Sequence, residues 1–391
     1  MRCSWTVSRG PAGRRWPRTA RHPCPTGASR CGSSVSWYLS AVHSDCFESS
    51  LTEGYGKLGK WLDGGWVVRG GEFAVEELEA LRGPLTGYCY RLLGSAADTD
   101  DAVQETLIRA SSRWEQYDPG RARLSTWVHR IATNVCIDML RAAKRRALVM
   151  DVGSAGPELG APLPAEVWVE PMPDSRVLAG QDPGEVVAGR ESVRLAFIAA
   201  LQRLAPRQRA VLVLRDVLVF SAQETAEILD TTVPAVNSAL QRARAALDAD
   251  RPDPFDVYDP EDAGQRDLLR RYVAAFESHD VAGLTAVLRE DAVASMPPFL
   301  WRLEGAGKIA TVMGDSDSCA GARLVPCRMN GAPGFGQYRP GDDGVLHPFA
   351  LIAVDIQDGR IARMVTFLGT HDRFAEFDLP EVLRGSEQVS V

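Results

Sequence analysis

The chain has 391 residues, of which 45% are hydrophobic and 24% are charged, and its formal net charge is −7. This length allows two or three domains with separate cores, and the composition is ordinary for a soluble globular protein. Neither a run long enough to span a membrane nor a signal peptide is evident, so we expect a cytoplasmic protein. The eight cysteines do not form the pattern of a disulfide framework.

The charge is unevenly distributed along the chain. Residues 151–189 contain seven acidic side chains and one arginine, whereas 141–146 (RAAKRR) and 242–244 are basic. A local patch, not the total charge, attracts phosphate. The negative total therefore does not exclude binding to nucleic acid.

Residues 1–73 are rich in Arg, Trp, Ser, Gly and Pro and lack helical or strand periodicity. We expect a disordered extension, or one wrongly included because translation starts near residue 72. This segment holds four cysteines and two histidines, but it has no CxxC pair and the spacings are irregular. We therefore expect neither a metal site nor a cofactor.

The pattern becomes strongly helical between residues 74 and 148. One apolar stripe runs from Leu78 to Leu92, and a second helix begins after Ser95. The second helix buries one side and leaves four polar residues on another, namely Asp101, Gln104, Glu105 and Arg109. From the residues alone, the alternative is a solvated surface, which is what most charged helix faces are.

A third helix begins near Thr126, after a turn-rich loop over residues 118–125. Trp127, Arg130 and Asn134 lie on one of its faces, and it ends in the basic run RAAKRR. Single-stranded nucleic acid is bound by aromatic stacking beside a cationic groove, and this helix supplies both. A core tryptophan remains the alternative for Trp127.

Residues 221–247 predict two short helices joined by a tight turn. Ser221 and Glu224 have the spacing of a capping box, and Pro234 suits the first turn of the second helix. The exposed side of that second helix carries Asn237, Ser238, Gln241, Arg242 and Arg244. A helix-turn-helix places such side chains in the major groove of DNA.

Two further segments complete the chain. Residues 149–189 are acidic and rich in Pro, Gly and Ala, which predicts an extended tether. Residues 264–378 predict two helices followed by a meander, in which Asp358-Gly359 is a hairpin signal. Helices followed by such a meander indicate an α+β cone.

The two helical blocks resemble a known family. DAVQETLIRA, followed by STWVHRIATNVCIDMLRAAKRR, resembles region 2 of bacterial RNA polymerase sigma factors of the extracytoplasmic-function type. APRQRAVLVLRDVLVFSAQETAEILDTTVPAVNSALQRARAAL resembles region 4 of the same family. MPPFLW and NGAPGFGQYR resemble the SnoaL-like branch of the NTF2-like superfamily, which an actinobacterial group of these factors carries as a C-terminal extension.

The resemblance implies a multidomain protein with two all-α domains followed by an α+β NTF2-like domain. Region 2 would occupy residues 74–148, the acidic linker 149–189, region 4 residues 190–250 and the SnoaL-like domain 264–378.

The resemblance also implies roles for the exposed faces. The polar face of the second helix would dock on the clamp coiled coil of the largest polymerase subunit, and the loop 118–125 would capture a flipped base. The melted −10 element would be bound by Trp127, Arg130, Asn134, Arg141, Lys144 and Arg145. The −35 element would be bound by Asn237, Ser238, Gln241, Arg242 and Arg244.

Some relatives of the C-terminal domain are enzymes such as ketosteroid isomerases. A carboxylate base and a hydrogen-bond donor facing each other across an apolar cavity would be needed for that chemistry. The candidates for a small-ligand pocket are Asp291, Trp301, Tyr338, Asp355 and His371. Their convergence does not follow from sequence, and we expect no enzyme.

We therefore expect a sigma factor that binds core RNA polymerase and promoter DNA, with its C-terminal domain adjusting its activity in cis. No dedicated anti-sigma partner and no membrane contact are expected. The alternatives are a helix-turn-helix regulator that acts without polymerase and a ligand-binding or isomerase activity in the C-terminal domain.

Overall fold

The computed structural model describes residues 60–62, 65–67, 73–142, 154–155, 160–164, 168–178, 186–248, 255–314 and 319–384. Most of the predicted N-terminal extension lies outside these residues, as do Lys144 and Arg145 of the predicted −10 face. Within the extension, β1 (Lys60–Leu62) and β2 (Gly65–Val67) form an antiparallel pair. In the described part of the chain, no helix is long and apolar enough to cross a membrane.

The first domain is a helical bundle of α3 (Phe73–Ala80), α4 (Arg82–Leu93), α5 (Ala96–Ser112) and α6 (Leu124–Ala142), with a short 3-10 turn at Trp114–Gln116. Gly94, at φ 72°, ends α4, as glycine often does at a helix C-terminus. Ser95 then caps α5, because its hydroxyl accepts from the backbone N–H of Asp98 at 3.2 Å. The side chains of the predicted apolar stripes are buried inside this bundle.

The second helical domain contains α8 (Val186–Val193), α9 (Leu195–Gln202), α10 (Pro206–Leu212), a π-helical turn (Val213–Val217), α11 (Ala222–Ile228) and α12 (Val233–Asp248). The predicted capping box is present: the hydroxyl of Ser221 accepts from the N–H of Glu224 at 3.1 Å, and the carboxylate of Glu224 accepts from the N–H of Ser221 at 2.9 Å. Helices α11 and α12 form the predicted helix-turn-helix.

The linker differs from the extended tether that its composition indicates. Trp168, Val169 and Met172 are buried, and α7 covers Asp174–Val177. The carboxylate of Glu170 accepts from the N–H of Ala96 at 2.7 Å, which adds a second cap to α5. The reason is that the apolar side chains of Trp168, Val169 and Met172 gain free energy by leaving water. At least residues 168–178 are therefore part of the folded structure.

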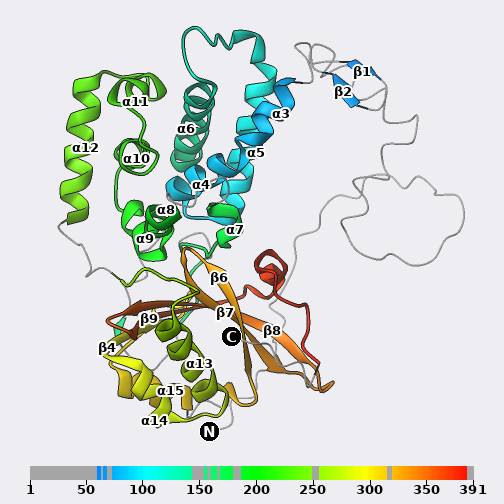
Figure 1. Cartoon of the computed structure of the whole chain (residues 1–391), viewed down its shortest axis with the longest axis vertical. Coiled ribbons are helices and arrows are strands. Elements are labelled where there is room, and N and C mark those ends of the chain that lie inside the picture. The colour runs from blue at the N-terminus through cyan, green and yellow to red at the C-terminus, as the bar shows by residue number, and fades with distance from the viewer. Residues whose placement is uncertain are drawn as a thin grey trace, which may run out of the picture. The chain divides into compact units, whose positions relative to one another are not determined.

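The C-terminal domain is the predicted α+β cone. Helices α13 (Ala263–Glu277), α14 (Val281–Val287) and α15 (Ala306–Gly314) cover one face of a sheet (Figure 1). The sheet order is β3-β5-β4-β9-β8-β7-β6, with β3 (Ser154–Ala155) supplied by the linker. The other strands are β4 (Leu288–Ser295), β5 (Trp301–Glu304), β6 (Arg323–Met329), β7 (Ala332–Pro340), β8 (Leu346–Gln357) and β9 (Arg360–Leu368).

Pairing along this sheet is antiparallel except between β3 and β5 and between β4 and β9. Asp358-Gly359 forms the predicted turn between β8 and β9, and Asn330-Gly331 forms a second turn between β6 and β7. A 3-10 helix, η5 (His371–Phe377), follows β9.

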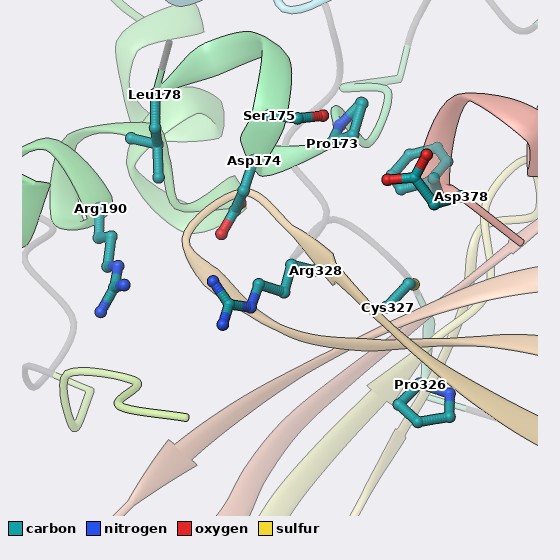
Figure 2. Close-up of a pocket in the computed structure, with 10 residues that line it drawn as sticks. Pro173, Asp174, Ser175, Leu178, Arg190, Pro326, Cys327, Arg328 and Asp378 are labelled. Atoms are coloured by element: carbon teal, nitrogen blue, oxygen red, sulfur yellow. The ribbon is translucent and has the colours of Figure 1, made fainter. Parts of the chain in front are cut away.

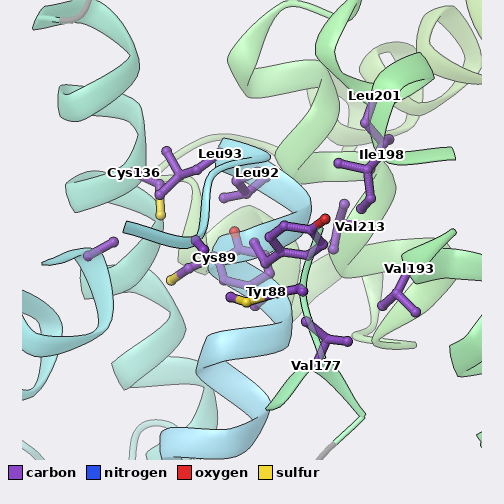
Figure 3. Close-up of a cluster of buried hydrophobic side chains, with 14 of the residues drawn as sticks. Tyr88, Cys89, Leu92, Leu93, Cys136, Val177, Val193, Ile198, Leu201 and Val213 are labelled. Atoms are coloured by element: carbon purple, nitrogen blue, oxygen red, sulfur yellow. The ribbon is translucent and has the colours of Figure 1, made fainter. Parts of the chain in front are cut away.

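The described residues form two hydrophobic cores. One lies between α13–α15 and the sheet, where Tyr272 packs on Phe276 and Phe335 with ring centroids 6.2 and 5.6 Å apart. The other is shared by both helical domains, the linker and the opposite face of the sheet. Figure 3 shows part of it, with Tyr88, Val177 and Ile198 contributed by the first domain, the linker and the second domain. The helical domains and the linker are thus packed together.

Candidate nucleic-acid and polymerase interface

The polar face of α5 is presented as the sequence predicts. Asp101 and Gln104 are exposed, while Glu105 and Arg109 are half-buried and joined by an ion pair of 2.6 Å between Nε and Oε1. Ile108 lies on the same face with 51% of its surface exposed. Sequence reasoning missed Ile108, although an apolar residue outside the buried stripe is a detectable signal. The face can therefore offer an apolar contact as well as charges.

The outer face of α6 carries Arg130, Asn134 and Arg141, all exposed. Trp127 is half-buried, and its ring centroid lies 5.3 Å from that of Tyr117 and 6.3 Å from that of Trp114. Trp127 is therefore neither a fully buried core residue nor a freely exposed one. It belongs to a three-ring aromatic cluster beside the cationic face.

The α12 face is exposed at Asn237, Ser238, Gln241 and Arg242. Its fifth predicted member, Arg244, is also exposed but donates two hydrogen bonds, of 2.9 and 2.7 Å, to the carboxylate of Asp216. Four side chains are therefore presented on one helix surface in the way that base-edge and phosphate contacts need. Arg244 would have to exchange Asp216 for a phosphate.

The α6 face is partly covered by the helix-turn-helix itself. Arg130 lies 3.9 Å from Asp230, and Arg123 lies 3.9 Å from Glu224. Between these pairs, the His129 ring packs on Phe220 with centroids 5.1 Å apart. The helix expected to bind the −10 element thus contacts the motif expected to bind the −35 element.

This α6–α11 interface leaves polar atoms without partners. The hydroxyls of Thr126 and Thr225 and the Nε2 atom of His129 are buried and make no hydrogen bond within the described structure. Burial lowers the pKa of His129 to about 4, although a hydrogen bond to the carbonyl of Ser125 opposes that shift. Unpartnered buried polar groups cost free energy, so this interface is imperfectly satisfied.

Two buried arginines join α4 to the second helical domain. Arg91 donates from Nη2 to the hydroxyl of Ser192 at 2.8 Å, and Arg209 donates to the carbonyl of Leu92 and to Gln202. Burial lowers the pKa of both guanidinium groups to about 10. Both remain cationic at neutral pH and are held by oxygen acceptors.

A turn of the C-terminal domain connects the three preceding segments. Asn330, fully buried at φ 55°, accepts from the N–H of Met172 at 2.8 Å and donates to the hydroxyl of Tyr90 at 2.7 Å and the carbonyl of Val193 at 2.8 Å. One amide therefore bonds the linker, the first helical domain and the second. We call Asn330, Gly331 and these partners the junction; Figure 1 shows the β6–β7 hairpin reaching toward α7 and α8.

The junction continues at Gly331, at φ 68°. Its N–H donates to the carboxylate of Asp174 at 2.7 Å, and a Cβ at this position would lie 2.5 Å from the carbonyl oxygen of Arg190. Only glycine fits such a position without displacing backbone. The Asn-Gly dipeptide is a turn signal in the sequence, but no local pattern reveals that the turn is buried.

The five residues expected in a ligand pocket do not converge. Asp291 is exposed and ion-paired with Arg289, and His371 is exposed at the start of η5. Tyr338 is buried and donates to the carbonyl of Pro380 at 2.6 Å. Trp301 is a buried residue at the start of β5.

The fifth residue, Asp355, makes a contact between domains. Its carboxylate lies 3.3 Å from the guanidinium of Arg194, which also donates to the carbonyl of Asp256. Burial raises the pKa of Asp355, and the nearby guanidinium groups of Arg363 and Arg194 oppose the shift. Asp355 therefore helps to hold region 4 against the sheet, and neither of two surface hollows is lined by any of the five residues.

Comparisons with known proteins agree with this architecture. Residues 78–146 match the model of sigma-70 region 2, and residues 194–247 match that of sigma-70 region 4. The ECF RNA polymerase sigma factor SigG of Mycobacterium tuberculosis is 42% identical over 325 residues, which cover 81% of this chain and 86% of SigG.

SigJ of the same organism is 30% identical over 217 residues, covering 56% of this chain and 62% of SigJ. The crystal structure of Mycobacterium tuberculosis SigJ matches with a TM-score of 0.51 at 23% identity, covering 78% of this chain and all of that one. These relatives are transcription initiation factors, not enzymes. The chain belongs to the extracytoplasmic-function family of RNA polymerase sigma factors.

Proposed function

We propose that the exposed faces divide the work of this sigma factor on core RNA polymerase and promoter DNA. The α5 face would dock on the clamp coiled coil, the α6 face would bind the melted −10 element, and the α12 face would read the −35 element. Support comes from the exposure of these residues and from the match of their segments to regions 2 and 4. The site of action would be the cytoplasm, where polymerase and chromosome meet.

The contact between α6 and α11 is incompatible with simultaneous binding of both elements. Their centres are about 25 base pairs apart, which is about 85 Å of duplex at about 3.4 Å per base pair. In the structure, Arg130 of α6 lies 3.9 Å from Asp230 of the helix-turn-helix. This packed arrangement, which we call the closed state, would therefore have to open before a promoter is engaged.

The C-terminal domain would hold the closed state together. The observation that carries this proposal is Asn330, whose buried amide bonds Tyr90, Met172 and Val193. Separation of regions 2 and 4 leaves at least one of these groups unpaired unless the hairpin withdraws. The domain would thus restrain the factor in cis, in place of a dedicated anti-sigma protein.

Transcription in vitro with core polymerase tests both parts of the proposal. The full chain should direct initiation from a promoter found by mapping transcripts that start when the protein is overproduced. Asn330→Ala should raise initiation at limiting sigma concentration, because its closed state is weaker. Asp358→Ala, in the exposed turn of the same sheet, is the matched control.

Failure of the full chain to bind core polymerase would contradict the proposed docking role of α5. Unchanged initiation by Asn330→Ala would contradict the restraint by the C-terminal domain.

A second set of variants separates base reading from phosphate binding on α12. Gln241→Ala should change the preferred −35 sequence, whereas Arg242→Ala should weaken all sequences alike and lower the salt dependence.

If the chain were a DNA-binding regulator that acts without polymerase, its match to sigma-70 region 2 would have no function. An isomerase in the C-terminal domain would need its catalytic side chains to face one cavity. Asp291, Tyr338 and Asp355 instead each bond a separate partner. Neither alternative is favoured by a specific observation.

A further inference from the structure

A hollow of about 510 Å³ lies beside the junction (Figure 2). Its walls come from parts of the chain far apart in sequence: α7 of the linker, α8 of region 4, strand β6 and the end of η5. Because the junction holds these segments together, the hollow would keep this form only while the junction is intact.

One end of the hollow is cationic. The guanidinium groups of Arg190 and Arg328 are turned toward it, with Asp174 next to them, and Asp378 lies on the opposite side (Figure 2). The Asp174 carboxylate is engaged by the N–H of Gly331 at 2.7 Å. Arg190 donates from Nη1 to the carbonyl of Tyr258 at 2.8 Å, and its other donors bond no acceptor among the residues that the structure describes. Two guanidinium groups beside one engaged carboxylate leave this end with a net positive charge.

The electrostatics of Asp174 agree with this description. Burial raises its pKa, while the N–H of Gly331 and the positive charges of Arg328 and Arg190 oppose the shift. Both arginines therefore act on the same small region. Guanidinium groups bind carboxylate and phosphate strongly because their planar donors match pairs of oxygen atoms.

The rest of the wall is largely apolar. Pro173 and Leu178 of the linker face it together with Pro326 and Phe377 of the C-terminal domain. A ligand site of this size typically combines an apolar wall with a few polar groups that fix orientation. The combination suits a small organic acid whose anionic group meets the arginines and whose carbon skeleton meets the apolar wall.

We propose that this hollow binds a small amphipathic organic anion, carrying a carboxylate or a phosphate, and that the bound anion stabilises the closed state. The regulatory part rests on the proposed restraint by the C-terminal domain. A ligand that binds only one state shifts the equilibrium toward it by mass action. The anion would therefore lower promoter-dependent initiation.

Calorimetric titration of the full chain tests the site. Benzoate and phenyl phosphate are the carboxylate and phosphate probes, and benzyl alcohol is the neutral control. At least one anion should bind and raise the melting temperature, and the alcohol should do neither. Arg328→Gln should weaken anion binding by about tenfold or more, because a charge-assisted hydrogen bond to the anion is lost.

Arg323→Gln is the matched control, because Arg323 lies on the same strand, outside the hollow, and pairs with Glu277 at 3.1 Å. Arg328→Lys keeps the charge and should bind with intermediate affinity. Absence of anion binding, equal binding of benzyl alcohol, or equal weakening by both glutamine variants would overturn the site. Which probe binds more tightly distinguishes a carboxylate from a phosphate ligand.

Transcription with and without the bound anion separates this inference from the proposed function. Inhibition that Arg328→Gln removes would support both. Arg328-dependent binding without inhibition would support the site and overturn its regulatory role. Absent binding together with activation by Asn330→Ala would overturn the site and leave the proposed restraint intact.

Discussion

Two of the contacts that keep regions 2 and 4 together, the α6–α11 interface and the junction, differ in quality. At the α6–α11 interface, the ion pairs are 3.9 Å long and the buried polar atoms of Thr126, His129 and Thr225 have no partner in the described structure. At the junction, both ends of the buried Asn330 amide and the N–H of Gly331 are hydrogen-bonded. The α6–α11 interface is thus the poorer of these two contacts, and the C-terminal domain supplies the better one. The buried Arg91 and Arg209 add a third contact, between α4 and region 4.

This difference indicates where the closed state is held. Separating α6 from α11 returns the unpartnered polar groups to water. The free energy gained by hydrating them offsets part of the free energy lost with the apolar contact. Opening the junction instead breaks well-formed buried hydrogen bonds, and each group left unpaired costs about 1–3 kcal/mol. The C-terminal hairpin should therefore control the opening of the sigma domains.

The largest effect is expected for Asn330→Ala. The change removes three buried hydrogen bonds, so the free energy of unfolding should fall by about 3 kcal/mol or more. Urea unfolding followed by circular dichroism measures this loss. Asp358→Ala also places alanine at a positive φ, 53° in the wild type, but in an exposed turn, and should lose only about 1–2 kcal/mol. Equal losses would contradict a special role for the junction.

Gly331→Ala should be next in size. A left-handed alanine costs about 1–2 kcal/mol, and the overlap with the Arg190 carbonyl adds about 1–3 kcal/mol. Gly359→Ala is the matched control, because Gly359 has φ 67° and no other atom lies within 4 Å of the position that an alanine Cβ would take. The difference between the two variants in thermal unfolding isolates the overlap, and a difference near zero would show that the turn is not confined.

Acidification should weaken the α6–α11 contact. The pKa of His129 is about 4 in the closed state against an ordinary 6.5, so the opened or unfolded chain binds more protons below pH 6.5. Stability should therefore fall as the pH drops from 6.5 toward 4, by about 2 kcal/mol at pH 5. His129→Leu should remove this part of the pH dependence in urea unfolding. If His129→Leu left the pH dependence of unfolding unchanged, the imidazole of His129 would have to be in contact with water in the folded protein.

The smallest effect is expected at the edge of the same interface. Asp230→Asn removes the ion pair to Arg130 while keeping a residue that tolerates φ 50°. An ion pair between two exposed side chains contributes little to stability, so the free energy of unfolding should change by less than about 1 kcal/mol. A loss as large as that of Asn330→Ala would invert the comparison between the two interfaces.

Local features of the fold could be predicted from sequence because their causes are local. The Ser221–Glu224 capping box, the Gly94 helix end and the Asp358-Gly359 turn each depend on a few neighbouring residues. The exposed faces of α5 and α12 followed from helical periodicity for the same reason. Their roles on polymerase and DNA remain predictions.

The contacts between domains could not be predicted in this way. The bond from Asn330 to Tyr90 spans 240 positions, and the ion pair of Asp355 with Arg194 spans 161. Composition indicated a tether where Trp168 and Met172 are buried, because those side chains become core residues only when distant surfaces meet. Asp355 was expected in a ligand pocket because its partner, Arg194, lies too far away in the sequence to be recognised.

The central claim is that the C-terminal domain holds regions 2 and 4 in the closed state. Pulsed electron–electron double resonance between spin labels at positions 112 and 246 tests this claim most directly. Both positions are exposed, one at the end of α5 and one near the end of α12. The free full chain should give one narrow distance distribution that matches the structure, and Asn330→Ala should shift the population toward the different distance that core polymerase also produces. A free chain that already has the polymerase-bound distance, or identical distributions for wild type and Asn330→Ala, would contradict the account.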